Sequence, residues 1–200
     1  VPHVVLSSAR GITDGVATAT RVRLAAEEQA EAVARYAVTD LGARRFGVLF
    51  PSHRAGVRMM GAFWDEVVRL GGEVRAVEGY GADERNFNGP IRKLVGASKP
   101  GSGTHDFDAL FIPDDALSVR RLVPFLKYWG VGVKTRPGLR GTSKRPFVQL
   151  LGAAGWNHGS VVDKGDNLTD NAVFVDAFVH DPDDAASDDF SRSFFARYRR

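Results

Sequence analysis

The stretch RRFGVLFPSHRAGVRMMGAFWDEVVRLGG, residues 44–72, decides the fold class of this chain. It begins with FGVLF at 46–50, a short apolar run of the kind that forms a buried strand. The polar loop PSHRAG follows, and apolar side chains then recur at helical spacing until Gly71 and Gly72 end the pattern. A strand, a loop and a helix in this order form the first half of a βαβ unit, and α/β proteins bind ligands at such a loop.

The apolar spacing inside this stretch also predicts which side of the helix is buried. Val57, Met60, Trp64, Val67 and Val68 recur at intervals close to one helical turn, which places them on one face. We therefore expect Trp64 to be a core residue that packs against the sheet.

Strands and helices alternate along the rest of the chain. Short apolar or alternating runs predict strands at 46–50, 73–79, 107–112, 147–152 and 172–177. Amphipathic patterns predict helices at 27–41, 87–95, 117–130 and 188–200. This alternation indicates right-handed βαβ crossovers, and so an α/β fold with a parallel, Rossmann-like sheet that carries helices on both faces.

The composition excludes several function classes. The chain has 200 residues, 44% of them hydrophobic, and a net charge of +3, which is typical of a globular α/β protein. No apolar run approaches the ~20 residues that span a bilayer, so we expect no transmembrane segment in this chain. The absence of Cys excludes disulfides and thiol nucleophiles. The basic stretch 134–145 lacks interleaved aromatic residues, so we expect a surface loop there and no nucleic-acid site.

The motifs of catalysis and cofactor binding are missing from the sequence. The five His residues lack the spacing of metal ligands. GASKPGSGT at 96–104 has two Gly residues at the spacing of a phosphate-binding loop, but Ser102 stands where the Lys of that motif would follow the second Gly. No G-x-G-x-x-G follows a predicted strand, and there is no G-x-S-x-G. We therefore expect no cofactor, no metal and no enzymatic activity, and an enzyme on a Rossmann-like sheet is the least favoured class.

Polar residues follow three of the predicted strands at the edge where parallel strands end. Ser52 and His53 follow the first strand, Asp114 follows the third, and Trp156 and Asn157 follow the fourth. Because these loops share one rim of the sheet, we predict that they form a ligand site in which Trp156 stacks on the ligand. The helix that begins after PSHRAG favours an acidic or polar group at its N-terminus. Two alternatives remain: Ser52 can cap that helix, and Trp156 can pack against a neighbouring helix.

The run HVVLSS at 3–8 predicts a strand that stands apart from this sheet. A Gly- and Thr-rich stretch at 9–21, which we interpret as a connector, separates it from the first helix. We interpret the strand as the last piece of a second lobe whose other strands are not in this chain. Ser7 and Ser8 then follow a strand of that lobe and should face the same ligand site across the gap.

Five segments follow one another in an order and spacing that few other folds match: VPHVVLSS, AAEEQAEAVARYAVTDLGARRFGVLFPSHRAGVRMMGAFWDEVVRLGGEV, FDALFIPDDA, VQLLGAAGWN, and NAVFVDAFV with FSRSFFARYR. This order resembles that of type I periplasmic binding proteins of the leucine/branched-chain amino acid-binding group. The resemblance implies a two-lobed receptor, in which residues 1–20 are the last strand of the N-terminal lobe and the crossover. Residues 21–180 would be the C-terminal lobe, and residues 181–200 a helix that returns toward the first lobe. It also implies a periplasmic or cell-envelope location, with a lipid anchor in a region before residue 1.

The resemblance departs from the amino acid binders at the ligand loops. Those proteins usually carry a Tyr where this chain has Ala55, and an acid after the fourth strand, where this chain reads GAAGWN. Burying an ammonium group without a counter-charge would cost several kcal/mol. A free α-amino acid is therefore not the expected ligand, and we expect a small polar or acidic solute.

Two functions fit this resemblance. The first is the substrate-binding component of an ABC transporter, with a membrane permease as its partner. The alternative comes from FDALFIPDDA and GAAGWN, which resemble the lipoprotein activators of class A penicillin-binding proteins. Such an activator contacts a peptidoglycan synthase, and its cleft need not hold a small molecule.

Overall fold

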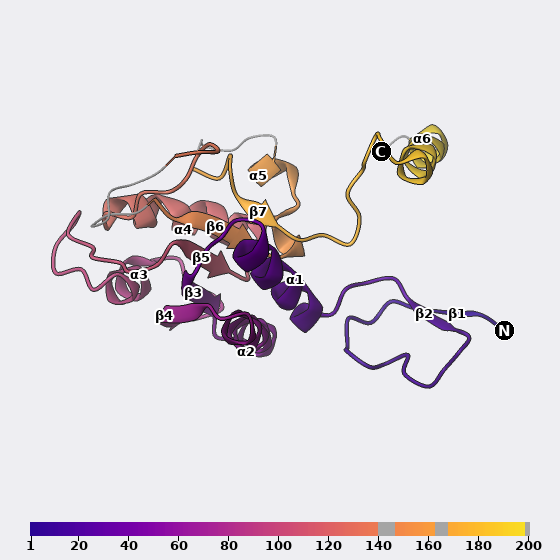
Figure 1. Cartoon of the computed structure of the whole chain (residues 1–200), viewed down its shortest axis with the longest axis horizontal. Helices are drawn as coiled ribbons and strands as arrows, with labels where there is room; N and C mark the ends of the chain where they lie inside the picture. Colours follow the sequence, from indigo (N-terminus) through magenta and orange to yellow (C-terminus); the bar gives the residue numbers. More distant parts are fainter. Residues whose placement is uncertain (140–146, 163–167, 199–200) are drawn as a thin grey trace.

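The computed structural model describes residues 1–139, 147–162 and 168–198, and within them five strands form one parallel sheet (Figure 1). The strand order is β4-β3-β5-β6-β7, and every neighbouring pair is parallel, as the sequence predicted. The strands are β3 (Arg45–Pro51), β4 (Glu73–Tyr80), β5 (Ala109–Ile112), β6 (Gln149–Gly152) and β7 (Val173–Phe174). Most of the predicted surface loop at 134–145, from residue 140 onward, lies outside the described residues.

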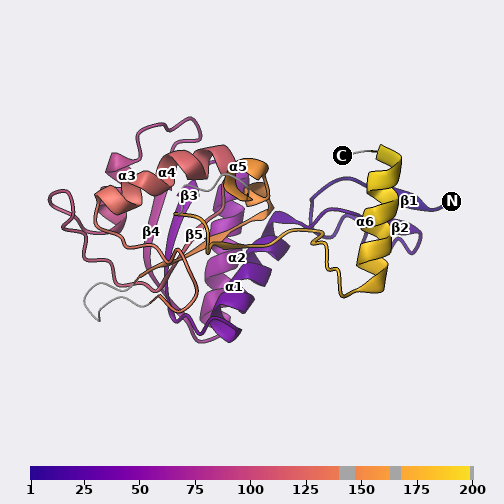
Figure 2. The ribbon, with the colours of Figure 1, turned by 90° about the horizontal axis from the view of Figure 1, so that it is seen from above.

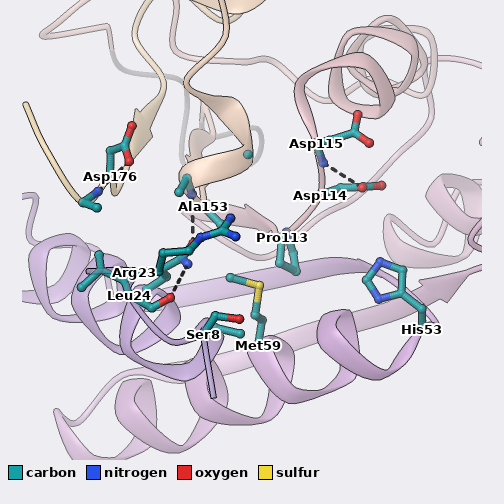
Figure 3. Close-up of a pocket in the computed structure, with 15 residues that line it drawn as sticks. Ser8, Arg23, Leu24, His53, Met59, Pro113, Asp114, Asp115, Ala153 and Asp176 are labelled. Atoms are coloured by element: carbon teal, nitrogen blue, oxygen red, sulfur yellow. Dashed lines mark hydrogen bonds between the residues drawn. The ribbon is translucent and has the colours of Figure 1, made fainter. Parts of the chain in front are cut away.

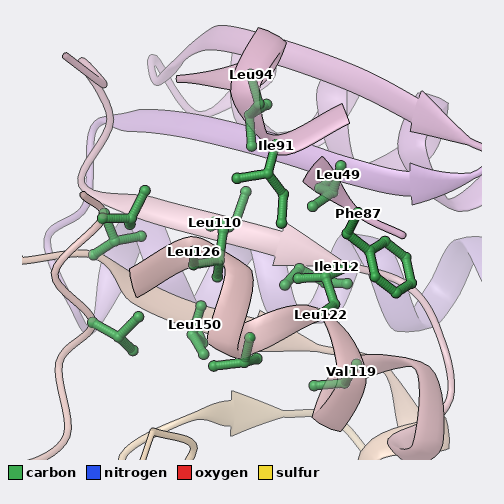
Figure 4. Packing of buried hydrophobic residues seen from close by; sticks show 14 of the residues in the cluster. Leu49, Phe87, Ile91, Leu94, Leu110, Ile112, Val119, Leu122, Leu126 and Leu150 are labelled. Carbon is green, nitrogen blue, oxygen red and sulfur yellow. The ribbon is translucent and has the colours of Figure 1, made fainter. Parts of the chain in front are cut away.

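Helices cover both faces of this sheet, so each face has its own hydrophobic core. On one face, α1 (Ala26–Thr39) and α2 (Arg54–Arg69) pack against Phe46 of β3 and Phe111 of β5. On the other, α3 (Asn88–Leu94) and α4 (Ala116–Tyr128) bury the leucines and isoleucines shown in Figure 4. Two short helices follow β6, namely η1 (Ala154–Trp156) and α5 (Gly159–Val162). The predicted α/β architecture is therefore confirmed.

Three elements lie outside this five-stranded body. Strands β1 (His3–Val5) and β2 (Ala19–Arg21) pair in parallel as a separate sheet, and α6 (Ala185–Tyr198) follows the body. Figures 1 and 2 show all three on the same side of the body and away from its sheet. The sequence predicts β1 and α6 but not β2, which lies at the end of the predicted connector at 9–21.

The predicted phase of α2 is wrong by one residue. The side chains that face the sheet are those of Met59, Phe63 and Val67, whereas Trp64 is 40% exposed. The reason lies in the sheet surface, because Phe63 stacks on Phe111 with ring centroids 4.3 Å apart and meets the edge of Phe46 at 5.6 Å. Two apolar stripes run side by side along α2, and only contact with these rings selects the one that is buried.

Gly56 and Gly61 in α2 give a matched test of this packing. A Cβ atom on Gly56 would lie 2.1 Å from the carbonyl oxygen of Pro51, so Gly56→Ala should lower the free energy of unfolding by about 1–3 kcal/mol. A Cβ on Gly61 would meet no atom within 4 Å, so Gly61→Ala should raise stability by up to about 1 kcal/mol through helix propensity. Urea denaturation followed by circular dichroism measures both. Changes of the same sign would contradict the close approach of α2 to β3.

Candidate functional site

A cavity of about 430 Å³ lies at the edge of the sheet where the parallel strands end (Figure 3). The loops after β3, β5, β6 and β7 contribute His53, Asp114, the backbone around Ala154, and Asp176 to its wall. The opposite part of the wall comes from the segment that precedes α1, through Ser8, Arg23 and Leu24. Two separate parts of the chain therefore line one open cavity.

The segment before α1 is held against that helix by ion pairs. The Arg10 guanidinium lies 2.6 Å from the carboxylate of Glu31, and Arg21 pairs with Glu28. Hydrogen bonds from the Ala25 N–H and from Arg21 hold the pKa of Glu28 below its usual range. These contacts explain why Ser8 and Arg23 can reach the cavity although β1 and β2 lie outside the body.

Three of the predicted site residues line the cavity: Ser8, His53 and Asp114. His53 is also the N-cap of α2, because its Nδ1 accepts a hydrogen bond of 3.0 Å from the N–H of Gly56. Ser52 therefore does not cap the helix, and its own N–H donates to the carbonyl of Tyr80 at 2.7 Å. Ser7 and Ser52 do not line the cavity.

Trp156 does not line the cavity, contrary to the prediction. Its ring is fully buried in the core beneath α4, and its Nε1–H donates to the carbonyl of Ile112 at 3.0 Å. The ring fits there because Gly152 has no side chain; a Cβ at that position would lie 2.4 Å from the ring. Trp156 is thus a structural residue, and the backbone at Ala154 and Gly155 forms the cavity wall instead.

Asn157 acts next to the cavity and not in its wall. Its Nδ2–H donates to Asp176, whose other oxygen accepts the N–H of Ala177 at 2.6 Å. Asp176 itself lines the cavity, although it is not among the site residues that the sequence predicts. The sequence predicts a fifth strand that runs to residue 177, whereas β7 ends at Phe174, so Asp176 belongs to the loop that follows the strand.

Asp114 is held in the cavity wall by two hydrogen bonds. The hydroxyl of Tyr80, from the end of β4, donates to one carboxylate oxygen at 2.6 Å, and the N–H of Asp115 donates to the other at 2.8 Å. Burial, the hydrogen bond to Asp114 and the charge of Asp114 raise the pKa of Tyr80. The phenol therefore keeps its proton, and remains a hydrogen-bond donor, across the pH range in which proteins are folded. The carboxylate of Asp115 caps α4 by accepting the N–H groups of Leu117 and Ser118.

Two further wall residues were missed because they precede or lie within α1. Gln29 joins the two parts of the wall, since its side chain accepts from the N–H of Ala154 at 3.1 Å and donates to the carbonyl of Leu24 at 3.3 Å. Arg23 lies over the cavity in Figure 3, and in the described part of the chain it has no carboxylate within ion-pair distance. Neither follows a strand of the sheet, so the rule that found His53 and Asp114 could not find them.

The charges around the cavity correct the inference from the sequence that the site lacks a counter-charge for an ammonium group. GAAGWN carries no acid, but Asp114, Asp115 and Asp176 reach the wall from the loops after β5 and β7. The cavity therefore does have counter-charge for a cation, and these carboxylates outnumber Arg23. Across the described ranges, no group of His, Asp or Glu side chains is arranged to hold a metal ion.

Comparison with solved structures decides the fold. A putative branched-chain amino acid ABC transporter protein from Rhodospirillum rubrum superimposes with a TM-score of 0.74 at 14% identity, over 100% of this chain and 51% of that one. A branched-chain amino acid transporter substrate-binding protein from Streptococcus pneumoniae, in complex with isoleucine, gives 0.67 at 17% identity, over 100% and 51%. The chain has the type I periplasmic-binding-protein fold.

A third structure of the type I periplasmic-binding-protein fold is a solute-binding protein of an ABC transporter from R. palustris in complex with benzoate. It gives a TM-score of 0.64 at 16% identity, over 92% of this chain and 44% of that one. The chain thus spans about half the length of these structures, and its five-stranded body corresponds to one lobe of the type I periplasmic-binding-protein fold. No protein-family model and no curated protein matches the sequence. No helix in the part of the chain that the structure describes is long and apolar enough to cross a membrane.

Proposed function

We propose that this chain forms one wall of the solute-binding cleft of an ABC-transporter substrate-binding protein. The observation that carries the proposal is the cavity of about 430 Å³ at the carboxyl edge of the sheet, bordered on its other side by the segment before α1. Ligands of open α/β sheets bind at this edge. Further support comes from neighbours of the same fold that were crystallised with isoleucine and with benzoate. On this proposal the protein is not an enzyme, works outside the cytoplasm and delivers its solute to a membrane permease.

We also propose that the elements outside the body belong to a second lobe. Among the described residues of α6 only Ser191 is buried, while Phe190, Phe194, Phe195 and Tyr198 are between 41% and 58% exposed. Val4 in β1 and Leu6 directly after it are also exposed. Apolar faces of this kind are normally covered. Residues 1–20 and 181–200 would then pack on that lobe, and residues 21–180 would form the C-terminal lobe.

The first test is a titration of the 200-residue chain with solutes of each charge type, followed by amide NMR. Isoleucine, benzoate and benzamidine represent a zwitterion, an anion and a cation. At least one should produce saturable shifts at Ala154, Gly155 and Asp115, with weak affinity because one wall removes only part of the ligand from water.

Two exposed positions supply matched variants for this titration. Ala177 lines the cavity, so Ala177→Trp should fill part of it and abolish the saturable shifts. Val179 is exposed and does not line the cavity, so Val179→Trp should leave them unchanged. Failure of every solute would overturn the proposal and favour the alternative, an activator of a peptidoglycan synthase whose fold contacts a protein.

A further inference from the structure

We propose that the cleft selects solutes that carry a cationic nitrogen, that Asp114 receives this group, and that Tyr80 positions Asp114 for it. The inference rests on the proposed function and names the class of solute. It differs from the small polar or acidic solute that the sequence predicted, because it starts from carboxylates that the fold brings to the cavity wall.

Asp114 has unused acceptor capacity. An ionised carboxylate can accept about four hydrogen bonds. Asp114 accepts one from the Tyr80 hydroxyl at 2.6 Å and one from the Asp115 N–H at 2.8 Å. No Lys, Arg or His in the described residues lies within ion-pair distance of it, although it lines the cavity and is only partly buried. Its remaining lone pairs are available to a ligand.

Tyr80 makes this carboxylate a fixed acceptor. The Tyr80 side chain is buried between Phe87, with ring centroids 5.2 Å apart, and the core beneath α3 and α4. Its hydroxyl therefore holds Asp114 from the protein side. A group that is already oriented loses little conformational entropy when the ligand binds, which favours affinity and selectivity.

The other charged residues in the wall are less suited to this role. The carboxylate of Asp115 caps α4, and Asp176 accepts bonds from Asn157 and Ala177. Figure 3 shows Asp176 on the opposite side of the cavity from Asp114, with Arg23 between them. A solute with both charges could place its carboxylate at Arg23 and its ammonium group at Asp114. A purely anionic solute would meet a wall in which carboxylates outnumber the one Arg.

Benzamidine, benzamide and benzoate provide a direct test, since they share one shape and differ in charge. The chain should bind benzamidine about tenfold or more tightly than benzamide, and benzoate most weakly. 2-Methylbutylamine and 3-methylpentanoate, which are isoleucine without its carboxylate and without its amine, should rank in the same way. Dissociation constants come from the amide NMR titration.

Three variants assign the effect to the proposed residues. Asp114→Asn should reduce the benzamidine-to-benzamide preference to about one, because the amide keeps the shape but not the charge. Tyr80→Phe should lower the preference about threefold or more while the charge of Asp114 remains. Asp65→Asn, on the exposed side of α2, should leave it unchanged. A general loss of structure would weaken both probes equally and leave their ratio intact, so the ratio separates positioning from folding.

The outcomes distinguish this inference from the proposed function. If benzoate binds at the cavity and benzamidine does not, the solute-binding function stands and the cationic class is wrong. An unchanged preference in Asp114→Asn would likewise overturn the role of Asp114. If no probe of any charge binds, the proposed function fails, and this inference fails with it.

Discussion

Phe63→Ala should lower the free energy of unfolding by about 3–5 kcal/mol, whereas Trp64→Ala should change it by less than about 1 kcal/mol. Phe63 is fully buried and its ring contacts Phe46 and Phe111, so truncation would leave a cavity between α2 and the sheet. Trp64 is the next residue and the larger side chain, but it is 40% exposed and lies beside the contact face. Truncation of the smaller side chain, Phe63, should therefore cost more stability than truncation of Trp64, although side-chain size alone would predict the opposite.

Guanidinium denaturation of both variants, followed by circular dichroism, measures the difference. A change in the transition midpoint at constant slope reports a change in stability. If Trp64→Ala proves as destabilising as Phe63→Ala, α2 would be rotated from the position described here. If the Phe63 variant does not fold, Phe63→Leu, which keeps part of the apolar volume, should be folded and of intermediate stability.

Trp156→Ala should also cost about 3–5 kcal/mol, because it removes the largest fully buried side chain of the described residues. Trp156→Phe should cost less, since it retains an apolar ring and loses one hydrogen bond to the Ile112 carbonyl, worth about 0.5–1.5 kcal/mol, in addition to a packing defect. That carbonyl also accepts the N–H of Asp114 at 3.0 Å, so it keeps one donor.

The ligand titration separates this structural role from a stacking role. Trp156→Phe should keep the benzamidine-to-benzamide preference of the unsubstituted chain, because the indole does not reach the cavity. Full stability combined with loss of solute binding would show instead that the indole touches the ligand. Denaturation and titration of the same variant therefore decide between the two readings of Trp156.

Most of the sheet was predictable because its strands are short apolar runs between clear helices. Val48, Leu49, Leu110 and Phe111 are buried on both faces of a parallel sheet, and such strands read as continuous apolar sequence. Strand β2 was not predictable in this way, since its three residues Ala19–Arg21 are small or polar and pair only with β1. The phase of α2 depends on contacts with Phe46 and Phe111, which the helix sequence does not contain.

The sequence predicted cavity-wall residues correctly only where the end of a strand determines the position of the side chain. His53 and Asp114 follow β3 and β5 directly, and the structure places both in the cavity wall. Trp156 also follows a strand, but the missing side chain of Gly152 lets its ring turn into the core. Arg23 and Tyr80 had no sequence signal, because one precedes a helix and the other acts through its contact with Asp114.

The arrangement of the body between the two outlying segments has a consequence for the order of folding. Both hydrophobic cores are built from residues between Ala26 and Phe174, so a ribosome releases the whole body as one continuous stretch. Strand β2 ends at Arg21, and α6 begins only at Ala185, so these two parts would have to meet across a long loop. The folded body shortens that loop, because Arg23 and Leu24 on one connection and Asp176 and Ala177 on the other line the same cavity. The two outlying segments can therefore come together only after the body has folded, and a substitution that slows folding of the body should delay their approach.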